Sequence, residues 1–118
     1  TVSNAYLDVD SNGGYEALTD GLLVVRYLYG LTATALTNGA IGAGAQRASA
    51  SQIVPYLNGI RARLDADGNG QTDAQTDGLL ILRYLFGFRG APLTNDALGP
   101  GATRTAAEIE TYVQSLMP

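Results

Sequence analysis

Carboxylate and amide side chains recur at alternate positions in two short segments of the chain. The two sets match at an offset of 57 residues: Asp8, Asp10, Asn12, Gly13 and Asp20 in the first, and Asp65, Asp67, Asn69, Gly70 and Asp77 in the second. Oxygen ligands at alternate positions, a Gly at the sixth place and an acid near the end wrap a hard cation in loops of the EF-hand type. The two segments therefore predict two Ca²⁺ ions per chain.

The ligand positions of such a loop can be assigned in both segments. Positions 1, 3, 5, 7 and 9 fall on Asp8, Asp10, Asn12, Gly14 and Glu16, and then on Asp65, Asp67, Asn69, Gln71 and Asp73. Position 7 would supply a backbone carbonyl, and position 9 would act directly or through water. Position 12 is Thr19 or Thr76, and the acid comes one place later. We therefore expect 13-residue loops closed by Asp20 and Asp77, with the two Thr residues capping the following helices.

Most of the acidic residues of the chain lie in these two segments. Eight of the eleven Asp and Glu residues are there, and neighbouring carboxylates repel one another unless a cation is bound. The alternative is a pair of solvated acidic turns, since Asp-Gly and Asn-Gly are common in turns. The recurrence of the spacing favours calcium.

Composition excludes several classes of function. The chain has 118 residues, 46% hydrophobic and 15% charged, as expected for one globular domain. It lacks Cys and His, which excludes Cys/His zinc sites, thiol nucleophiles, imidazole bases and disulfides. A net charge of -4 argues against nucleic acid as a partner, and the apolar runs are too short for a membrane span.

A short apolar helix is predicted after each loop. The two helices cover Leu22 to Tyr29 and Leu79 to Phe86, and Gly30 and Gly87 follow as C′ residues. Apolar residues on all sides indicate buried helices. Arg26 and Arg83 interrupt them, and we interpret each as a solvated head on a packed stem or as a contact to a partner.

A Gly/Ala/Thr-rich stretch and a second helix complete each repeat. The stretch repeats its own residues, so we expect an ordered loop with four apolar anchors: Leu36, Ile41, Leu93 and Leu98. Capping boxes then begin the second helices, Ser49 with Gln52 and Thr105 with Glu108. Pro55 should kink or shorten the first of these helices, and the segment 55–63 is expected to continue as a helix into loop two.

The expected fold is all-α: a single domain, 1–118, made of two calcium loop–helix–helix repeats at 7–60 and 64–117 related by a pseudo-twofold axis. Loop two has a helix directly before it, whereas only Thr1 to Leu7 precede loop one. By symmetry the terminal helix, Thr105 to Met117, should occupy the place before loop one. It can come from the same chain or from a neighbouring one.

The two Asp-x-Asp-x-Asn-Gly loops, each followed by an apolar helix with Arg-Tyr-Leu, resemble dockerin modules. The resemblance covers about 24 residues of each repeat. It implies structural calcium, secretion by a prokaryote and a cohesin as partner. The chain departs from the dockerin pattern in the closing position, in the wide spacing of the repeats, and in having Ala17-Leu18 and Ala74-Gln75 where dockerins often carry the residues that contact cohesin.

We expect a noncatalytic, extracellular or cell-surface module in which two Ca²⁺ ions stabilise the fold and support protein–protein assembly. Two alternatives are a self-assembling subunit of an extracellular filament or surface layer, and a cohesin-binding dockerin of a carbohydrate-active enzyme. The partner would be another copy of the chain or a cohesin-like domain. The chain begins at Thr1 rather than Met, which we interpret as processing or as a fragment of a longer protein.

Overall fold

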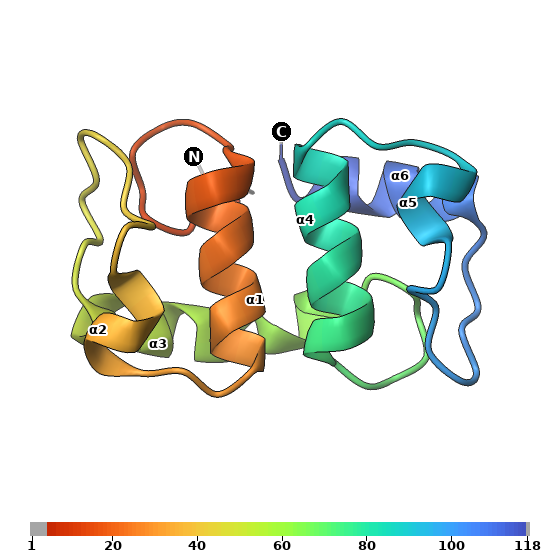
Figure 1. Cartoon of the computed structure of the whole chain (residues 1–118), viewed down its shortest axis with the longest axis horizontal. Coiled ribbons are helices and arrows are strands. Elements are labelled where there is room, and N and C mark those ends of the chain that lie inside the picture. The colour runs from red at the N-terminus through yellow and green to blue at the C-terminus, as the bar shows by residue number, and fades with distance from the viewer. Residues whose placement is uncertain (1–4, 118) are drawn as a thin grey trace.

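All regular secondary structure in residues 5–117, the part of the chain that the computed structural model describes, is helical. The all-α prediction is therefore confirmed for these residues. The elements are α1 (Leu22–Leu28), α2 (Ala33–Thr37), α3 (Ala50–Ile60), α4 (Leu79–Leu85), α5 (Ala91–Thr94) and α6 (Ala106–Ser115), with single π-helical turns η1 (Ala17–Gly21) and η3 (Ala74–Gly78) and a 3₁₀-helix η2 (Arg61–Leu64). Figure 1 shows α1 to α3 on one side of the molecule and α4 to α6 on the other.

Helices α1 and α4 lie side by side and antiparallel at the centre of the molecule (Figure 1). Each begins at a Gly that packs against the far end of the other helix. A Cβ atom on Gly21 would lie 3.0 Å from Leu82 Cδ1 and 3.3 Å from Leu85 Cδ1, and one on Gly78 would lie 3.3 Å from Leu28 Cδ1. A larger residue at either Gly would push the two helices apart.

Both central helices end as the sequence predicts. Gly30 and Gly87 have φ angles of +86° and +98°, which favour glycine. The N–H of Leu31 donates to the carbonyl of Arg26 at 3.0 Å, and the equivalent bond from Phe88 to Arg83 is 2.9 Å. This pattern is the Schellman motif, and it satisfies carbonyls that the helix itself leaves free.

The guanidinium groups of Arg26 and Arg83 make hydrogen bonds within the chain, which neither interpretation made from the sequence included. Arg26 Nη1 donates to the carbonyls of Leu36 and Asn38, at 3.0 and 2.7 Å. Arg83 makes the equivalent bonds to Leu93 and Asn95, at 3.1 and 2.7 Å. The guanidinium groups thus bind the carbonyls at the ends of α2 and α5, where the helix leaves them without intrahelical donors.

The Gly/Ala/Thr-rich stretches are ordered, as predicted, but one predicted anchor is wrong. Leu36 and Leu93 are fully buried and Ile41 packs against the core, whereas Leu98 is 46% exposed. Ala97 is buried in its place. The N–H of the next residue, Gly99, donates to the carboxylate of Asp67, as that of Gly42 does to Asp10 after the packed Ile41, so this bond does not explain the exposure of Leu98.

The second helix of each repeat begins at its predicted capping box. In the box at the start of α6, the Thr105 hydroxyl accepts from the Glu108 N–H, and the Glu108 carboxylate accepts from the Thr105 N–H. The expected shortening of α3 by Pro55 does not occur, since the helix runs on to Ile60. Pro55 lies on the exposed side of the helix, where its ring meets solvent. Helix η2 then leads directly into loop two, as expected.

The terminal helix meets the start of loop one in the same chain. The N–H of Leu7 donates to the carbonyl of Leu116 at 3.2 Å, and both side chains are buried. Of the two possibilities for the terminal helix, docking within its own chain is the one present here. The first four residues, which belong to the Thr1 to Leu7 segment, lie outside the described residues. No helix in 5–117 has the length and apolarity needed to cross a membrane.

Candidate metal centres

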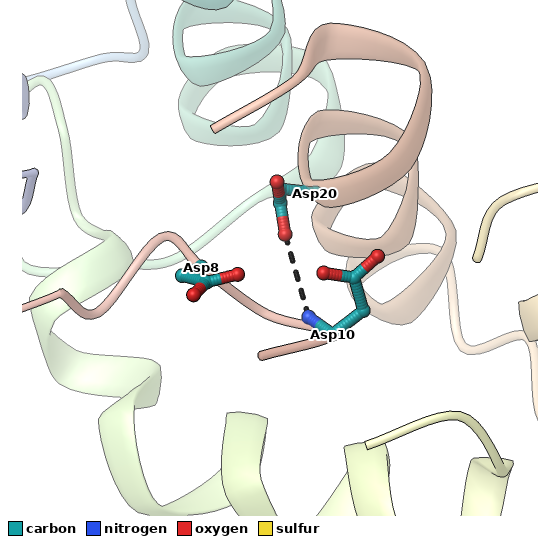
Figure 2. A group of neighbouring side chains, drawn as sticks. All are labelled: Asp8, Asp10 and Asp20. Atoms are coloured by element: carbon teal, nitrogen blue, oxygen red, sulfur yellow. Dashed lines mark hydrogen bonds between the residues drawn. The ribbon is translucent and has the colours of Figure 1, made fainter. Parts of the chain in front are cut away.

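Three carboxylates of loop one converge on a single point. Oxygen atoms of Asp8, Asp10 and Asp20 all lie within 4.8 Å of one another, and Figure 2 shows the three side chains facing the same space. Asp10 and Asp20 are fully buried, and Asp8 is partly buried. A carboxylate triad held this closely is a group of hard oxygen ligands suited to a cation.

The second repeat forms an equivalent triad. Oxygen atoms of Asp65, Asp67 and Asp77 also lie within 4.8 Å of one another, with the same burial at each position. The two Asp triads could therefore each hold a metal ion. We call them the first and second triad.

The first acid of each triad folds its own loop. Asp8 accepts hydrogen bonds from the N–H groups of Asn12 and Gly13, at 3.1 and 2.9 Å. Asp65 accepts from those of Asn69 and Gly70, at 3.2 and 2.9 Å. Gly13 and Gly70 have φ angles of +88° and +87°, so the sixth place of the loop needs Gly for the turn.

The last acid of each triad ties the end of the loop to its start. Asp20 Oδ1 accepts from the N–H of Val9 at 2.7 Å, while its Oδ2 accepts from that of Glu16 at 3.0 Å. Asp77 accepts from Asp67 and Asp73 in the same way, at 3.2 and 2.8 Å. These bonds hold the side chain beside the other two acids.

The predicted capping role of Thr19 and Thr76 is wrong. The residues before the first helical turn are Glu16 and Asp73, whose backbone is extended and whose side chains make no capping bond. Thr19 instead lies inside η1, with its hydroxyl 3.4 Å from Asp20 Oδ2. The acid one residue later, Asp20, accepts from the N–H of Glu16, so Asp20 rather than Thr19 bonds to the start of the turn.

The π-helical turns account for the 13-residue loops. The N–H of Gly21 bonds to the carbonyl of Glu16, and that of Gly78 to Asp73, both at 3.1 Å. Each bond spans five residues rather than the four of an α-helix, so the turn contains one additional residue. That residue moves the closing acid from position 12 to position 13 while α1 and α4 keep their places. Single π-turns are frequent at functional sites.

The first triad contains a buried oxygen atom with no hydrogen-bond partner among residues 5–117. It is Oδ1 of Asp10, a fully buried residue. Burial also raises the pKa of Asp20 to about 6, with a smaller upward contribution from the Asp10 carboxylate and opposing hydrogen bonds from backbone N–H groups. The pKa of Asp77 is likewise raised to about 6, mainly by burial and less by the carboxylates of Asp67 and Asp65, against the hydrogen bonds from the N–H groups of Asp73 and Asp67. A buried negative charge is unfavourable without a compensating positive charge, and a bound cation would supply that positive charge.

The other predicted ligands lie at the rim of the triads. Asn12 accepts the N–H of Gly14 at 3.0 Å, and its amide donates to Glu16 Oε1 at 3.3 Å. In the second repeat, Asn69 accepts the N–H of Gln71 at 3.0 Å. Three of the predicted ligands are exposed and stand outside the close triads: Glu16, Gln71 and Asp73.

Each loop is covered by a later segment of its own repeat, which sequence reasoning did not connect to the site. We call residues 42–47 and 99–104 the cover segments. The N–H of Gly42 donates to Asp10 Oδ2 and that of Gly99 to Asp67 Oδ2, both at 2.7 Å. A Cβ on Gly99 would lie 2.7 Å from Asn69 Nδ2 and 3.0 Å from Asp67 Oδ2, so the cover segment fits only with Gly at this place.

The cover segments end in Arg47 and Arg104, which bind the first residues of the loops. Arg47 donates to the carbonyls of Val9 and Asp8 at 2.9 and 3.0 Å, and lies 3.7 Å from the centre of the Tyr56 ring. In the second repeat, Arg104 donates to the carbonyls of Asp65 and Ala66 and lies over the ring of Tyr112. The signal that could have found these residues is their recurrence at the same offset as the Asp residues.

The comparisons with known proteins find no match to a protein-family model, to a curated protein or to a solved structure.

Proposed function

We propose that the chain is a noncatalytic module that binds two Ca²⁺ ions, one at each triad, and that the ions stabilise its fold. The observation that carries the proposal is Asp10 Oδ1, a buried carboxylate oxygen without a donor, facing two further carboxylates. A cation in that space would satisfy the oxygen and offset the repulsion among the three acids. The second triad brings Asp65, Asp67 and Asp77 equally close, although there Asp67 Oδ1 accepts the N–H of Asn69 at 3.2 Å.

The proposed ligand sets contain the triads, together with the rim oxygens. They are Asp8, Asp10, Asn12, Gly14, Glu16 and Asp20 in the first repeat, and Asp65, Asp67, Asn69, Gln71, Asp73 and Asp77 in the second. Oxygen donors only, and six of them, match the preference of Ca²⁺ for six to eight oxygen ligands. The smaller Mg²⁺ demands a stricter octahedral geometry and keeps more of its water.

We also propose that the two repeats form an EF-hand-like pair with pseudo-twofold symmetry. Supporting this, bonds of one repeat recur in the other at the same offset, including those from the cover segments to the second acids and those from Arg26 and Arg83. The similarity to dockerins is compatible with this arrangement, and with an extracellular location where calcium is abundant enough to fill weak sites.

Calcium titration and melting in parallel test the proposal. Isothermal titration should show two bound Ca²⁺ ions per chain. Removing calcium should lower the melting temperature, because a ligand at a hundredfold excess over its Kd stabilises the folded state by about 2.7 kcal/mol per site. Identical melting curves with calcium and with excess chelator, in a protein that takes up no Ca²⁺ in the titration, would refute it.

The partner of the module is proposed to be a protein. Four exposed apolar side chains recur in pairs next to the helix-ending glycines: Tyr29, Leu31, Phe86 and Phe88. Side chains of this kind are frequent at the centres of protein interfaces. With two Ca²⁺ bound, the net charge of -4 would also be cancelled, which favours association. Light scattering at high protein concentration, with calcium and with chelator, distinguishes association with copies of itself from a strict monomer.

A further inference from the structure

Arg47 and Arg104 lie beside the metal loops although both carry a positive charge. Arg47 donates from two different nitrogens, Nε and Nη2, to two successive carbonyls of loop one. Arg104 Nη1 donates to the carbonyls of Asp65 and Ala66, at 2.7 and 3.1 Å. A cation next to a cation site opposes metal binding by Coulomb repulsion. The arrangement therefore needs a reason other than charge.

The backbone beside each Arg continues the same contact. The N–H of Arg47 donates to the carbonyl of Asp10 at 3.0 Å, and that of Gln46 to the carbonyl of Ser11 at 3.2 Å. In the second repeat the N–H groups of Thr103 and Arg104 both donate to the carbonyl of Asp67, at 2.9 and 3.2 Å. Four successive loop residues of the first repeat, 8–11, are thus held through their carbonyls.

A Tyr ring fixes each guanidinium in place. Arg47 lies 3.7 Å from the ring centre of Tyr56 and Arg104 lies 3.8 Å from that of Tyr112. The two rings are themselves tied to the chain before each loop, since Tyr56 donates to the carbonyl of Tyr6 at 2.8 Å and Tyr112 to that of Arg63 at 2.6 Å. A planar guanidinium can stack flat on the ring while the N–H groups at its edge point at the loop carbonyls, whereas an ammonium lacks this planar fork.

We infer that Arg47 and Arg104 are positioning residues of the two metal sites, an inference that rests on the proposed function. Each holds the start of its loop in the wrapped form, so that the first two acids face the third before a metal arrives. The cover segment completes this from the other side, because the N–H of Gly42 or Gly99 donates to Oδ2 of the second acid. In the first triad the other oxygen of that acid has no donor among residues 5–117. Residues that orient metal ligands typically change affinity by about 10- to 100-fold when replaced.

The sign of the effect separates positioning from charge. Removing a positive charge near a cation site would by itself tighten Ca²⁺ binding. Positioning predicts the opposite. Arg47→Gln should weaken the first site about 10- to 100-fold and leave the second unchanged, and Arg104→Gln should do the reverse. Arg47→Lys keeps the charge but lacks the planar fork, so it should not restore the affinity.

The experiment is a calcium titration of both sites in these variants, with hydrogen exchange of residues 42–47 as a second readout. Arg89→Gln is the matched control: it removes the same charge from a guanidinium 3.6 Å above the Tyr84 ring, away from both loops. The control should keep both affinities. In the wild type, Ca²⁺ should slow exchange of the Arg47 and Gln46 amides, and in Arg47→Gln this protection should be smaller.

Three results would overturn the inference. In Arg47→Gln the first site could keep or gain affinity, or Arg47→Lys could restore it fully. Alternatively, both sites could weaken together with an equal drop in the melting temperature of the calcium-free protein, which is what a purely structural Arg would produce. If the wild type binds two Ca²⁺ ions and Arg47→Gln binds them with unchanged affinity, only this inference is refuted. If the wild type binds no Ca²⁺, the proposed function is refuted as well.

Discussion

At the scale of single residues, the absence of Lys has a structural explanation. Each of the seven Arg side chains donates to backbone carbonyls, lies over a Tyr ring, or does both. Five of them lie over Tyr rings, at 3.6 to 5.4 Å from the ring centres. These contacts use the planar, multi-donor shape of guanidinium, so Lys would not replace it.

Replacing the closing acid should remove one site. Asp77→Asn keeps the size of the side chain but removes a charge from the second triad, so titration should show one Ca²⁺ event unchanged and the other strongly weakened. Thr76→Ala removes only a hydroxyl that lies 3.4 Å from Asp77 Oδ2 and should change the affinity little. Loss of binding in Thr76→Ala with retention in Asp77→Asn would show that the loop closes at position 12.

Tyr15 offers a spectroscopic label for the first site. Burial and the nearby carboxylates of Asp8 and Asp20 raise the pKa of Tyr15, which places the ring beside the first triad. The matching residue of the second repeat is Thr72. Tb³⁺ bound in place of Ca²⁺ should give Tyr-sensitised luminescence from both sites, because Asp65 and Asp77 also act on the Tyr112 ring. Tyr15→Phe should lower the luminescence of the first site without changing the stoichiometry of binding. Equal luminescence in Tyr15→Phe would place the emitting ion elsewhere.

At this scale the sequence predicted which acids would come together but not how they are held. Alternation and recurrence were sufficient to select Asp8, Asp10 and Asp20, because loop position determines where their side chains point. The donors to Asp10 could not be predicted in the same way. They come from Gly42 and from the segment that follows it, and only the fold brings that segment over the loop.

At the scale of elements, the junction of loop and helix shows what a repeat pattern can and cannot specify. The shifted acid was visible in the sequence, and a π-turn is its structural counterpart. The position of the cap was not visible, because Thr19 lies inside the turn and Asp20 accepts from the N–H of Glu16 at its start. The sequence rules for helix caps assume an α-helical first turn, and here the first turn is π-helical and contains one more residue.

The fit of the cover segment over the loop can be tested with a pair of Gly substitutions. Gly99→Ala places a Cβ 3.0 Å from Asp67 Oδ2, so the segment must shift and the second site should lose about tenfold in affinity or more. Gly59→Ala is the control, since a Cβ there meets nothing within 4 Å. In a helix it should stabilise the fold by about 0.5–1 kcal/mol without affecting calcium. Calcium titration and thermal melting of both variants provide the comparison.

At the scale of the whole molecule, the two closing acids set opposite pH dependences for the calcium-free and calcium-bound protein. The pKa of Asp20 and of Asp77 is about 6 in the folded state, against about 3.9 in an unfolded chain. Between these values the folded protein binds more protons than the unfolded one. The free energy of unfolding of the calcium-free protein should therefore fall as pH rises through this range.

Melting of metal-free and calcium-saturated protein at about pH 5 and about pH 7.5 checks this expectation. The metal-free protein should melt at the higher temperature at the lower pH. The calcium-saturated protein should do the reverse, because protons compete with the ion for the same carboxylates. In a double variant, Asp20→Asn with Asp77→Asn, the pH dependence of the metal-free protein should be much reduced. A metal-free protein whose stability rises from pH 5 to 7.5 would contradict the pKa values.

The sequence indicated where the terminal helix lies but not how the two central helices pack. The expectation that the terminal helix lies before loop one followed from comparing what precedes each loop, and the Leu7 to Leu116 bond agrees with it. The antiparallel contact of α1 with α4 was not predicted. It depends on Gly21 and Gly78 meeting side chains of the opposite repeat, and such pairing leaves no trace in the periodicity of either helix alone.

The bond between Leu7 and Leu116 brings the entry and exit of the chain to one place. A tension applied to both ends would then load this joint, together with the neighbouring bond from Tyr56 to the carbonyl of Tyr6, and pull α6 away from loop one instead of shearing the whole core at once. Peeling of this kind resists force weakly. Helix α6 also carries Tyr112, whose ring lies under Arg104 beside loop two. Under load, opening of the joint would thus loosen the supports of both triads.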